Sequence, residues 1–335
     1  MTTDGEADEI LVDPNWDNNA TDDDDSAFAD EASTRQSLTE SVRQYRKLHG
    51  RTYQNFNSEN NYWGPNDAVQ NEGLDLSHQM LYHALDDRLF LAPIPSNPQR
   101  VLDIGTGTGI WAIDFADQYP SAEVIGTDLS PIQPDWVPTN CSFELHDAET
   151  RWHWPDNHFD FIHVRCLMGS IKDWPALYRQ IYRCLKPGGW LEHLDYSIDI
   201  TCDDNSIPAG SVFDGWGKFF QEAGEKLGQT FRVIEDGRNV KWQQDAGFEN
   251  IQHYYFKLPL GGWPNDKKWK QVGLYNQLIT SDSMEGYILF LLRNVYGWSY
   301  EDVQAFEDKA RRLIRKSSVH SYFGAGVVWS QKPSN

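Results

Sequence analysis

Short apolar runs separated by amphipathic stretches dominate the middle of the chain. Val101–Ile104 and Val124–Asp128 are apolar enough to be buried strands, and the pattern recurs over Cys141–Leu145, Phe159–Val164 and Trp190–Asp195. Strands that are apolar along most of their length are typical of parallel sheets, which helices cover on both faces. We therefore predict an α/β fold built on a doubly wound, Rossmann-like sheet.

Helical periodicity marks the connections between these strands. Ile110–Ala116 opens a helix directly after the first strand. A second helix follows the fourth strand, with Asp173 as its N-cap and Lys186–Gly189 as its stop. Its apolar residues recur at helical spacing, at Trp174, Leu177, Tyr178, Ile181, Tyr182 and Leu185.

Further elements flank this central region. Before it we expect a short helix through Leu38, Val42, Tyr45 and Leu48, and a longer one through Leu74, His78, Leu81, Leu85 and Leu89. After it we expect helices over Ser211–Gly228 and Val240–Gly247, a strand over Ile251–Leu258 and an antiparallel last strand over His320–Gln331. The long helical insertion before that strand, which includes Met284–Val295, is well placed to be a lid. The expected regions are an acidic disordered tail (1–34), an N-terminal helical cap (35–98), the sheet core (99–257), a helical lid (258–319) and the last strand (320–335).

Acidic residues are concentrated at the start of the chain. Of the net charge of −21, twelve negative charges lie within the first 31 residues, which contain no Lys or Arg. A segment of this charge density with few apolar residues cannot bury enough surface to order itself, so we expect a solvated solubility tail. The alternative is an arm that binds a basic partner surface. The chain has no basic stripe of the kind that direct nucleic-acid binding requires.

Composition places the chain among intracellular enzymes. We find no leader peptide and no apolar run long enough to cross a bilayer, so we expect no membrane association and a cytoplasmic or nuclear location. The four cysteines are Cys141, Cys166, Cys184 and Cys202, and none forms a C-x-x-C pair. We therefore expect neither a metal site nor a disulfide.

The loop after the first strand carries the most specific motif. Asp103-Ile104-Gly105-Thr106-Gly107-Thr108-Gly109 has the form D-x-G-x-G-x-G, whereas dinucleotide-binding loops have G-x-G-x-x-G. Glycines at alternate positions let the backbone turn sharply and approach a ligand closely. Asp128 ends the next strand about twenty residues later, where a carboxylate accepts both hydroxyls of a ribose. The pattern indicates a nucleoside site; the alternative is a glycine-rich turn without a ligand.

This loop resembles motif I of the S-adenosylmethionine-dependent class I methyltransferases, and Leu185–Leu191, with the sequence L-K-P-G-G-W-L, resembles a second segment of these enzymes. The resemblance implies S-adenosylmethionine as the cofactor and places Asp147, after the third strand, at the adenine amino group. The residues expected to bind the cofactor are Tyr53, Tyr62, Asp103, Gly105, Thr106, Gly107, Thr108, Gly109, Trp111, Asp128, Leu129, Asp147, Ala148, Glu149, Arg165 and Cys166.

Segments outside these motifs are similar to the LaeA-like methyltransferases of filamentous fungi over about residues 35–333. They are Gly50–Tyr53, Tyr62–Asp67, Trp111–Ala116, Asp128–Pro134, Gly169–Trp174 and His320–Tyr322. This family includes tailoring enzymes of biosynthetic clusters and regulators of secondary metabolism that work with velvet-domain proteins. The resemblance implies a methyltransferase acting on an O or N atom of a small-molecule secondary metabolite. The alternatives are a nuclear regulator that associates with a velvet-type partner, and a cofactor-binding protein without catalysis.

Methyl transfer requires little acid–base catalysis by the protein, because the cofactor supplies the reactive methyl group. Our candidate general base is His193, which period-two alternation places on the same strand face as Asp195. The alternative is a structural histidine, and His320 is a second candidate base. An aromatic acceptor pocket is expected from Trp216, Trp263, Tyr254, Tyr275, Phe290 and Tyr322, each of which could instead be a core residue.

Overall fold

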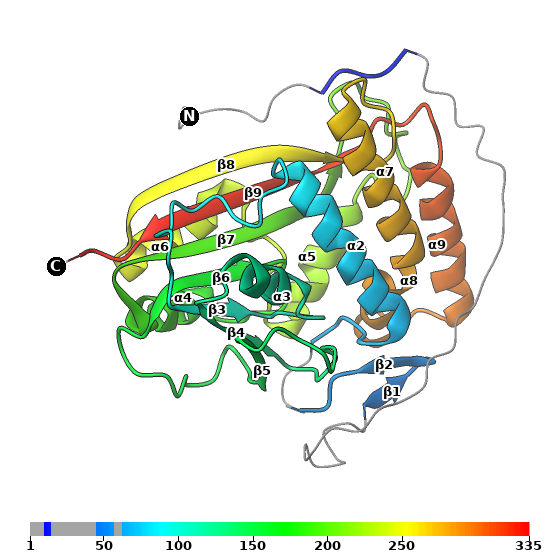
Figure 1. The fold of residues 1–335 in the computed structure, drawn as a ribbon. Helices are drawn as coiled ribbons and strands as arrows, with labels where there is room; N and C mark the ends of the chain where they lie inside the picture. The colour runs from blue at the N-terminus through cyan, green and yellow to red at the C-terminus, as the bar shows by residue number, and fades with distance from the viewer. Residues whose placement is uncertain (1–9, 15–44, 57–61, 335) are drawn as a thin grey trace.

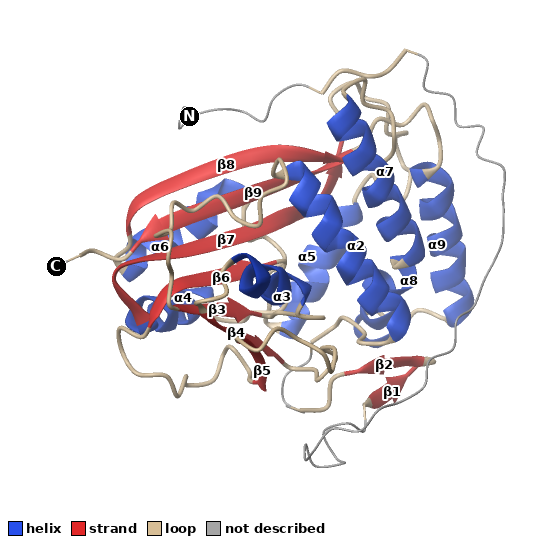
Figure 2. Cartoon of the chain, viewed as in Figure 1, coloured by secondary structure: helices blue, strands red, loops and turns tan. Residues whose placement is uncertain are grey.

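A seven-stranded mixed sheet organises the protein (Figures 1 and 2). The computed structural model describes residues 10–14, 45–56 and 62–334. The strand order is β5-β4-β3-β6-β7-β9-β8. The strands are β3 (Arg100–Ile104), β4 (Glu123–Asp128), β5 (Cys141–Leu145), β6 (Phe159–Arg165), β7 (Leu185–Thr201), β8 (Glu249–Pro259) and β9 (Tyr322–Gln331).

The chain reverses its direction of travel across the sheet between β3 and β6. It runs outward from β3 through β4 to β5, returns to β6 on the other side of β3, and continues to β7. All of these strands pair in parallel, whereas β9 is antiparallel to both β7 and β8. In open sheets of this kind ligands bind outside the carboxyl ends of the strands at the reversal point. The predicted doubly wound sheet with a final antiparallel strand is confirmed.

Alternating residues of the central strands face two separate cores. On one face Val101 and Phe161 pack with α3 (Ile110–Gln118), around Trp111 and Phe115. On the other face Leu102 joins the larger core, which includes α4 (Trp174–Cys184) and α5 (Trp216–Leu227). Helix α6 (Arg238–Ala246), which follows a 3-10 turn at Glu235–Gly237, packs beside α4. Burial on both faces explains why the strands are apolar at consecutive positions.

A group of helices covers one end of the sheet (Figure 1). Helix α2 (Ala68–Ala84) packs along α7 (Lys267–Asp282), and α8 (Met284–Phe290), a π-helical turn (Leu291–Val295) and α9 (Tyr300–Ile314) follow. Asp67 caps α2, Asp266 caps α7, and a capping box at Ser299 and Asp302 starts α9. The predicted helical lid and the longer N-terminal helix are confirmed as helices. No described helix is long and apolar enough to cross a bilayer.

The short helix predicted in the N-terminal region was wrong. Arg46–Leu48 and Arg51–Tyr53 form a hairpin, β1–β2, where we predicted the end of an amphipathic helix; Leu38 and Val42 lie outside the described residues. The turn at His49 and Gly50 has positive φ at both residues, a conformation that ends a helix and suits a tight hairpin.

Part of the acidic segment contacts the body of the protein, contrary to our expectation for residues 1–34. Val12 forms an antiparallel bridge with Pro264, and the Asp13 amide donates to the Trp263 carbonyl over 2.6 Å. The Asp13 carboxylate also pairs with the Lys270 ammonium. The side chains of Leu11 and Val12 stay exposed, so backbone hydrogen bonds and the ion pair of Asp13 make this contact. Residues 1–9 and 15–34 lie outside the described residues.

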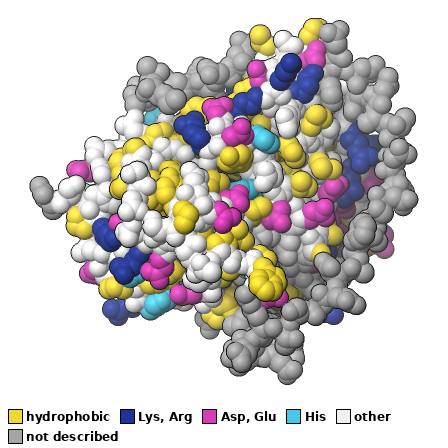
Figure 3. Space-filling view, viewed as in Figure 1, with side chains coloured by type: hydrophobic (Ala, Val, Ile, Leu, Met, Phe, Trp, Pro, Cys, Tyr) yellow, Lys and Arg dark blue, Asp and Glu magenta, His cyan; other side chains and the backbone are white. Residues whose placement is uncertain are grey.

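Charged side chains are mixed on the surface seen in Figure 3. The described lysines and arginines of this face lie among acidic and apolar side chains, without forming a continuous stripe.

Candidate functional site

The carboxyl ends of β3, β4, β5 and β6 border a cavity of about 170 Å³, which α2 and α8 cover. The strand ends contribute Asp128 and Arg165, and α2 contributes Gln70, Leu74 and His78. The following residues expected to bind the cofactor line the cavity: Tyr62, Gly105, Thr106, Gly107, Thr108, Asp128, Leu129, Asp147, Ala148, Arg165 and Cys166. We call it the cofactor cavity.

The glycine-rich loop takes a shape that L-residues rarely adopt. Gly105 and Gly107 have φ of 67° and 59°. A Cβ at Gly105 would lie 2.4 Å from the Leu167 side chain, and one at Gly107 would lie 3.3 Å from Leu74. The Gly107 amide donates to Asp128 over 2.8 Å, so the loop and the end of β4 hold each other. The structure thus explains why glycine occurs at these two positions.

Asp128 is the carboxylate at the centre of the site. Its oxygens accept from the amides of Gly107 and Ser130, over 2.8 and 2.9 Å. Burial raises the pKa of Asp128 to about 6, although these amide hydrogen bonds favour the ionised form. Asp128 is therefore largely ionised at pH 7 and can accept further hydrogen bonds from a ligand that reaches it.

Five residues expected to contact the cofactor do not line the cavity: Tyr53, Asp103, Gly109, Trp111 and Glu149. Asp103 accepts from the Thr106 hydroxyl over 2.6 Å and from His163 Nδ1 over 2.7 Å. Trp111 stacks on the His163 ring with centroids 3.7 Å apart. Burial lowers the pKa of His163 to about 4, so the ring is neutral and donates to Asp103. These residues support the loop from behind.

The other three corrections have local causes. Tyr53 is fully buried against Phe290. A Cβ at Gly109 would overlap the ring of Phe143, so this glycine serves packing. The carboxylate of Glu149 accepts from the Lys172 amide over 2.7 Å and does not line the cavity.

Our expectation that His193 faces the acceptor is also wrong. The His193 side chain has no exposed surface and lines neither this cavity nor the second one described below. Its Nδ1 is hydrogen-bonded to the Tyr178 hydroxyl over 2.6 Å, its Nε2 lies 3.3 Å from Asp195, and its ring stacks on Trp174. His193 is a hydrogen-bonded core residue. His320 is bound to Asp204 over 2.6 Å and also lies outside both cavities.

A second, smaller cavity of about 50 Å³ adjoins the first. The two share the lining residues Trp63, Ser77, Leu81, Met168, Tyr196 and Tyr287. Its other walls are mostly apolar and include Met80, Ile198, Trp216 and Phe220. The described residues that line it include no Asp, Glu, His, Lys or Arg. We call it the acceptor cavity, after the role that we propose for it below.

Of the aromatic residues expected at an acceptor pocket, only Trp216 lines this cavity. The Trp263 indole donates to the Ser321 carbonyl, and the Tyr322 hydroxyl donates to Asp203. The rings of Tyr254, Tyr275 and Phe290 contact those of Phe256, His83 and Tyr53. These five side chains are satisfied by neighbours elsewhere in the fold.

Several residues at the site are not among those expected from the sequence. Asn66 donates to the Ser130 hydroxyl over 3.1 Å, and Gln133 donates to the Gly107 carbonyl over 2.7 Å. Both residues lie in segments that carried the family resemblance, so a signal was available. Tyr196 and Tyr287 line both cavities, but no local pattern marks them, because they come from β7 and α8.

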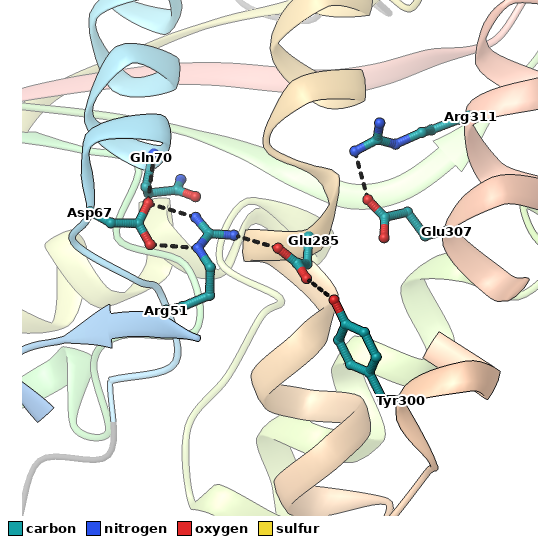
Figure 4. Close-up of polar contacts among 7 residues, drawn as sticks. All are labelled: Arg51, Asp67, Gln70, Glu285, Tyr300, Glu307 and Arg311. Carbon is teal, nitrogen blue, oxygen red and sulfur yellow. Dashed lines mark hydrogen bonds and ion pairs between the residues drawn. The ribbon is translucent and has the colours of Figure 1, made fainter. Parts of the chain in front are cut away.

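An ion-pair cluster closes the helical cover beside the site (Figure 4). Arg51 of the hairpin donates to both carboxylate oxygens of Asp67 at the start of α2, and to Glu285 of α8 over 3.2 Å. Tyr300 of α9 donates to the same Glu285 over 3.1 Å. Burial raises the pKa of Asp67, but its hydrogen bonds with Arg51 and with backbone amides, together with the charge of Arg51, leave this pKa below the ordinary value. Arg51 thus joins elements distant in sequence.

We expect Arg51→Ala to lower the melting temperature by about 5 °C or more, because it leaves two partly buried carboxylates without their partner. Arg311→Ala is the matched control, since Arg311 pairs with Glu307 within α9 alone (Figure 4) and such a pair contributes about 0.5 kcal/mol. Scanning calorimetry of the two variants checks this. Equal shifts would show that the cluster does not hold the cover in place.

Several known proteins are similar to this chain in sequence. A family profile described as "Methyltransferase domain" matches residues 76–253. "Methyltransferase pytC" of Aspergillus terreus is 39% identical over 312 residues, covering 92% of this chain and 94% of the relative. "Secondary metabolism regulator LAE1" of Cochliobolus heterostrophus is 35% identical over 279 residues, covering 81% and 90%. "Protein-methionine methyltransferase laeA" of Emericella nidulans is 35% identical over 294 residues, covering 87% and 77%.

Solved structures are similar at a lower level. The [4+2]-cyclase SpnF superposes with a TM-score of 0.47 and 16% identity, covering 76% of this chain and 81% of the other. Phosphoethanolamine N-methyltransferase 2 of Haemonchus contortus, in complex with S-adenosyl-L-methionine, has a TM-score of 0.43 and 19% identity, with coverage of 82% and 54%.

Proposed function

This chain belongs to the LaeA-like fungal S-adenosylmethionine-dependent methyltransferases, and we propose that it methylates an O or N atom of a small, largely apolar secondary metabolite. The observation that carries the proposal is the acceptor cavity. It is mostly apolar and shares six lining residues with the cofactor cavity, so a group bound in one lies beside the contents of the other.

The residues of the cofactor cavity fit S-adenosylmethionine. Asp128 has carboxylate oxygens available for ribose hydroxyls, and Asp147 lies at the neighbouring strand end, where the family resemblance places the adenine amino group. The glycine loop brings backbone amides to the ligand without a Cβ in the way. The bound cofactor supplies an electrophilic methyl group on a sulfonium.

The protein contributes alignment and exclusion of water. Leu81 and Met168 lie in the shared wall and keep the path of the methyl group apolar. Tyr196 and Tyr287 lie in the same wall. Burial raises the pKa of Tyr287 to about 12 and that of Tyr196 further, so both phenols stay protonated and orient an acceptor oxygen or nitrogen by hydrogen bonding. The described lining of the acceptor cavity offers no carboxylate or imidazole base, so we infer that the acceptor reacts in a form that needs none.

Transfer of a labelled methyl group tests the proposal. Purified protein is incubated with methyl-labelled S-adenosylmethionine and a metabolite extract of a producing fungus, and small molecules are separated from protein. We expect label in an apolar small molecule and none with Asp128→Ala. Label recovered only in protein, or no transfer to any metabolite, contradicts the proposal.

A second function is supported by the regulators among the relatives, such as LAE1 at 35% identity. In this role the chain would act in the nucleus through association with a velvet-type partner. Deletion of the gene discriminates between the two functions. Loss of many unrelated metabolites supports a regulator, whereas accumulation of one unmethylated precursor supports the tailoring enzyme.

A further inference from the structure

The cofactor cavity contains one permanent cation among its described lining residues. It is Arg165 at the end of β6, whereas the carboxylate of Asp128 ends β4 and that of Asp147 follows β5. The strand order β5-β4-β3-β6 therefore separates the acidic side of the cavity from the cationic side, with the glycine loop after β3 between them.

The hydrogen bonds of Arg165 determine which ring nitrogen of His78 carries the proton. Both terminal nitrogens of Arg165 lie 3.3 Å from Nδ1 of His78, a buried residue of α2. A guanidinium can only donate, so Nδ1 is the acceptor and the ring proton is on Nε2. Nε2 then donates to Asp114 of α3 over 2.9 Å. Three elements thus hold Arg165 in one orientation.

This arrangement orients Arg165 without neutralising it. Burial lowers the pKa of His78 below its ordinary value despite the hydrogen bond to Asp114, so the imidazole is neutral near pH 7. No ion pair joins Arg165 to a carboxylate anywhere in the described residues. A cation that lines a cavity, is fixed in place and keeps its full charge is suited to bind an anionic group of a ligand.

We propose that Arg165 binds the α-carboxylate of S-adenosylmethionine and that His78, held by Asp114, is its positioning residue. The carboxylate is the only anionic group of the cofactor. With the ribose at Asp128 and the adenine at Asp147, the nucleoside lies over β4 and β5, and the amino-acid part extends across β3 towards β6. Arg165 lies at the end of β6, on the side of the cavity that the amino-acid part would reach. The proposal rests on the cofactor and not on the identity of the acceptor.

Two ligands that differ in the amino-acid part test this assignment. S-adenosylhomocysteine carries the carboxylate, and 5′-methylthioadenosine has the same nucleoside without it. By calorimetry, we expect Arg165→Gln to weaken binding of S-adenosylhomocysteine about tenfold or more and binding of methylthioadenosine less than about twofold. Arg100→Gln is the control, since Arg100 is half exposed at the opposite end of neighbouring β3.

Substitutions at His78 separate positioning from general support of the fold. His78→Leu removes the acceptor for Arg165 and is expected to reduce the preference for S-adenosylhomocysteine severalfold. His78→Asn places an amide oxygen near the position of Nδ1 and is expected to restore most of that preference, although it loses the contact with Asp114.

Equal weakening of both ligands by Arg165→Gln would overturn the proposal, because it would assign Arg165 to the architecture of the cavity. Unchanged binding of both ligands would overturn it as well. Equal ligand preference in the two His78 variants would remove the positioning role. None of these measurements uses an acceptor, so their failure is distinguishable from a failure of the proposed methyl transfer.

Discussion

Asp128→Ala is expected to weaken binding of S-adenosylhomocysteine by about a hundredfold or more while the protein stays folded. A buried carboxylate that accepts two ribose hydroxyls contributes about 1.5–3 kcal/mol for each charge-assisted hydrogen bond. The substitution also releases the amide of Gly107, which loosens the loop. Calorimetry gives the affinity, and Asp117→Ala, an exposed aspartate of α3, is the control. Wild-type affinity in Asp128→Ala would assign Asp128 to loop structure alone.

We also expect the ionisation of Asp128 to make ligand affinity and stability depend on pH. Because the pKa of Asp128 is about 6, its ionised form grows between about pH 5 and 7, and affinity for S-adenosylhomocysteine should rise over that range. The contribution of Asp128 to folding stability has the opposite pH dependence. A carboxylate whose pKa is raised on folding favours the folded state at low pH, so this contribution to the stability of the ligand-free protein decreases from about pH 4 to 6. Asp128→Asn removes the ionisation, and an unchanged pH profile in this variant would exclude Asp128 as its source.

Ser77→Leu is expected to reduce methyl transfer by about a hundredfold or more. Ser77 lines both cavities, and its hydroxyl donates to the Gly73 carbonyl of the same helix. A leucine adds three carbon atoms at the wall between the cavities, and a displacement of about 1 Å at a reacting centre costs about a hundredfold in rate.

The control for this prediction is Ser77→Ala, which leaves the passage open and should retain most of the activity. Labelled methyl transfer and calorimetry with S-adenosylhomocysteine are measured on both variants. We expect the leucine variant to bind this ligand within about threefold of wild type, because most of the cofactor cavity is untouched. Full turnover in the leucine variant would mean that acceptor and cofactor meet elsewhere.

Local sequence signals placed much of the cofactor cavity correctly. The glycine loop, Asp128 and Asp147 line it as expected, because the carboxyl ends of neighbouring parallel strands meet at one edge of the sheet. Asp103 and Trp111 were also expected to contact the cofactor, but neither lines the cavity. Asp103 begins the motif and Trp111 lies in the helix just after it. Their side chains contact His163 behind the loop, which the local pattern does not reveal.

The sequence by itself determined the sheet, the cofactor motif and the helical cover, because each depends on short-range periodicity and on residues close together in the chain. Only the tertiary structure decided the composition of the acceptor cavity, the burial of His193 and the contacts of His78. Tyr196 and Tyr287 meet across about ninety residues, and His78 meets Arg165 and Asp114 from separate elements. Contacts of this range depend on how packed elements fit, which no local pattern encodes.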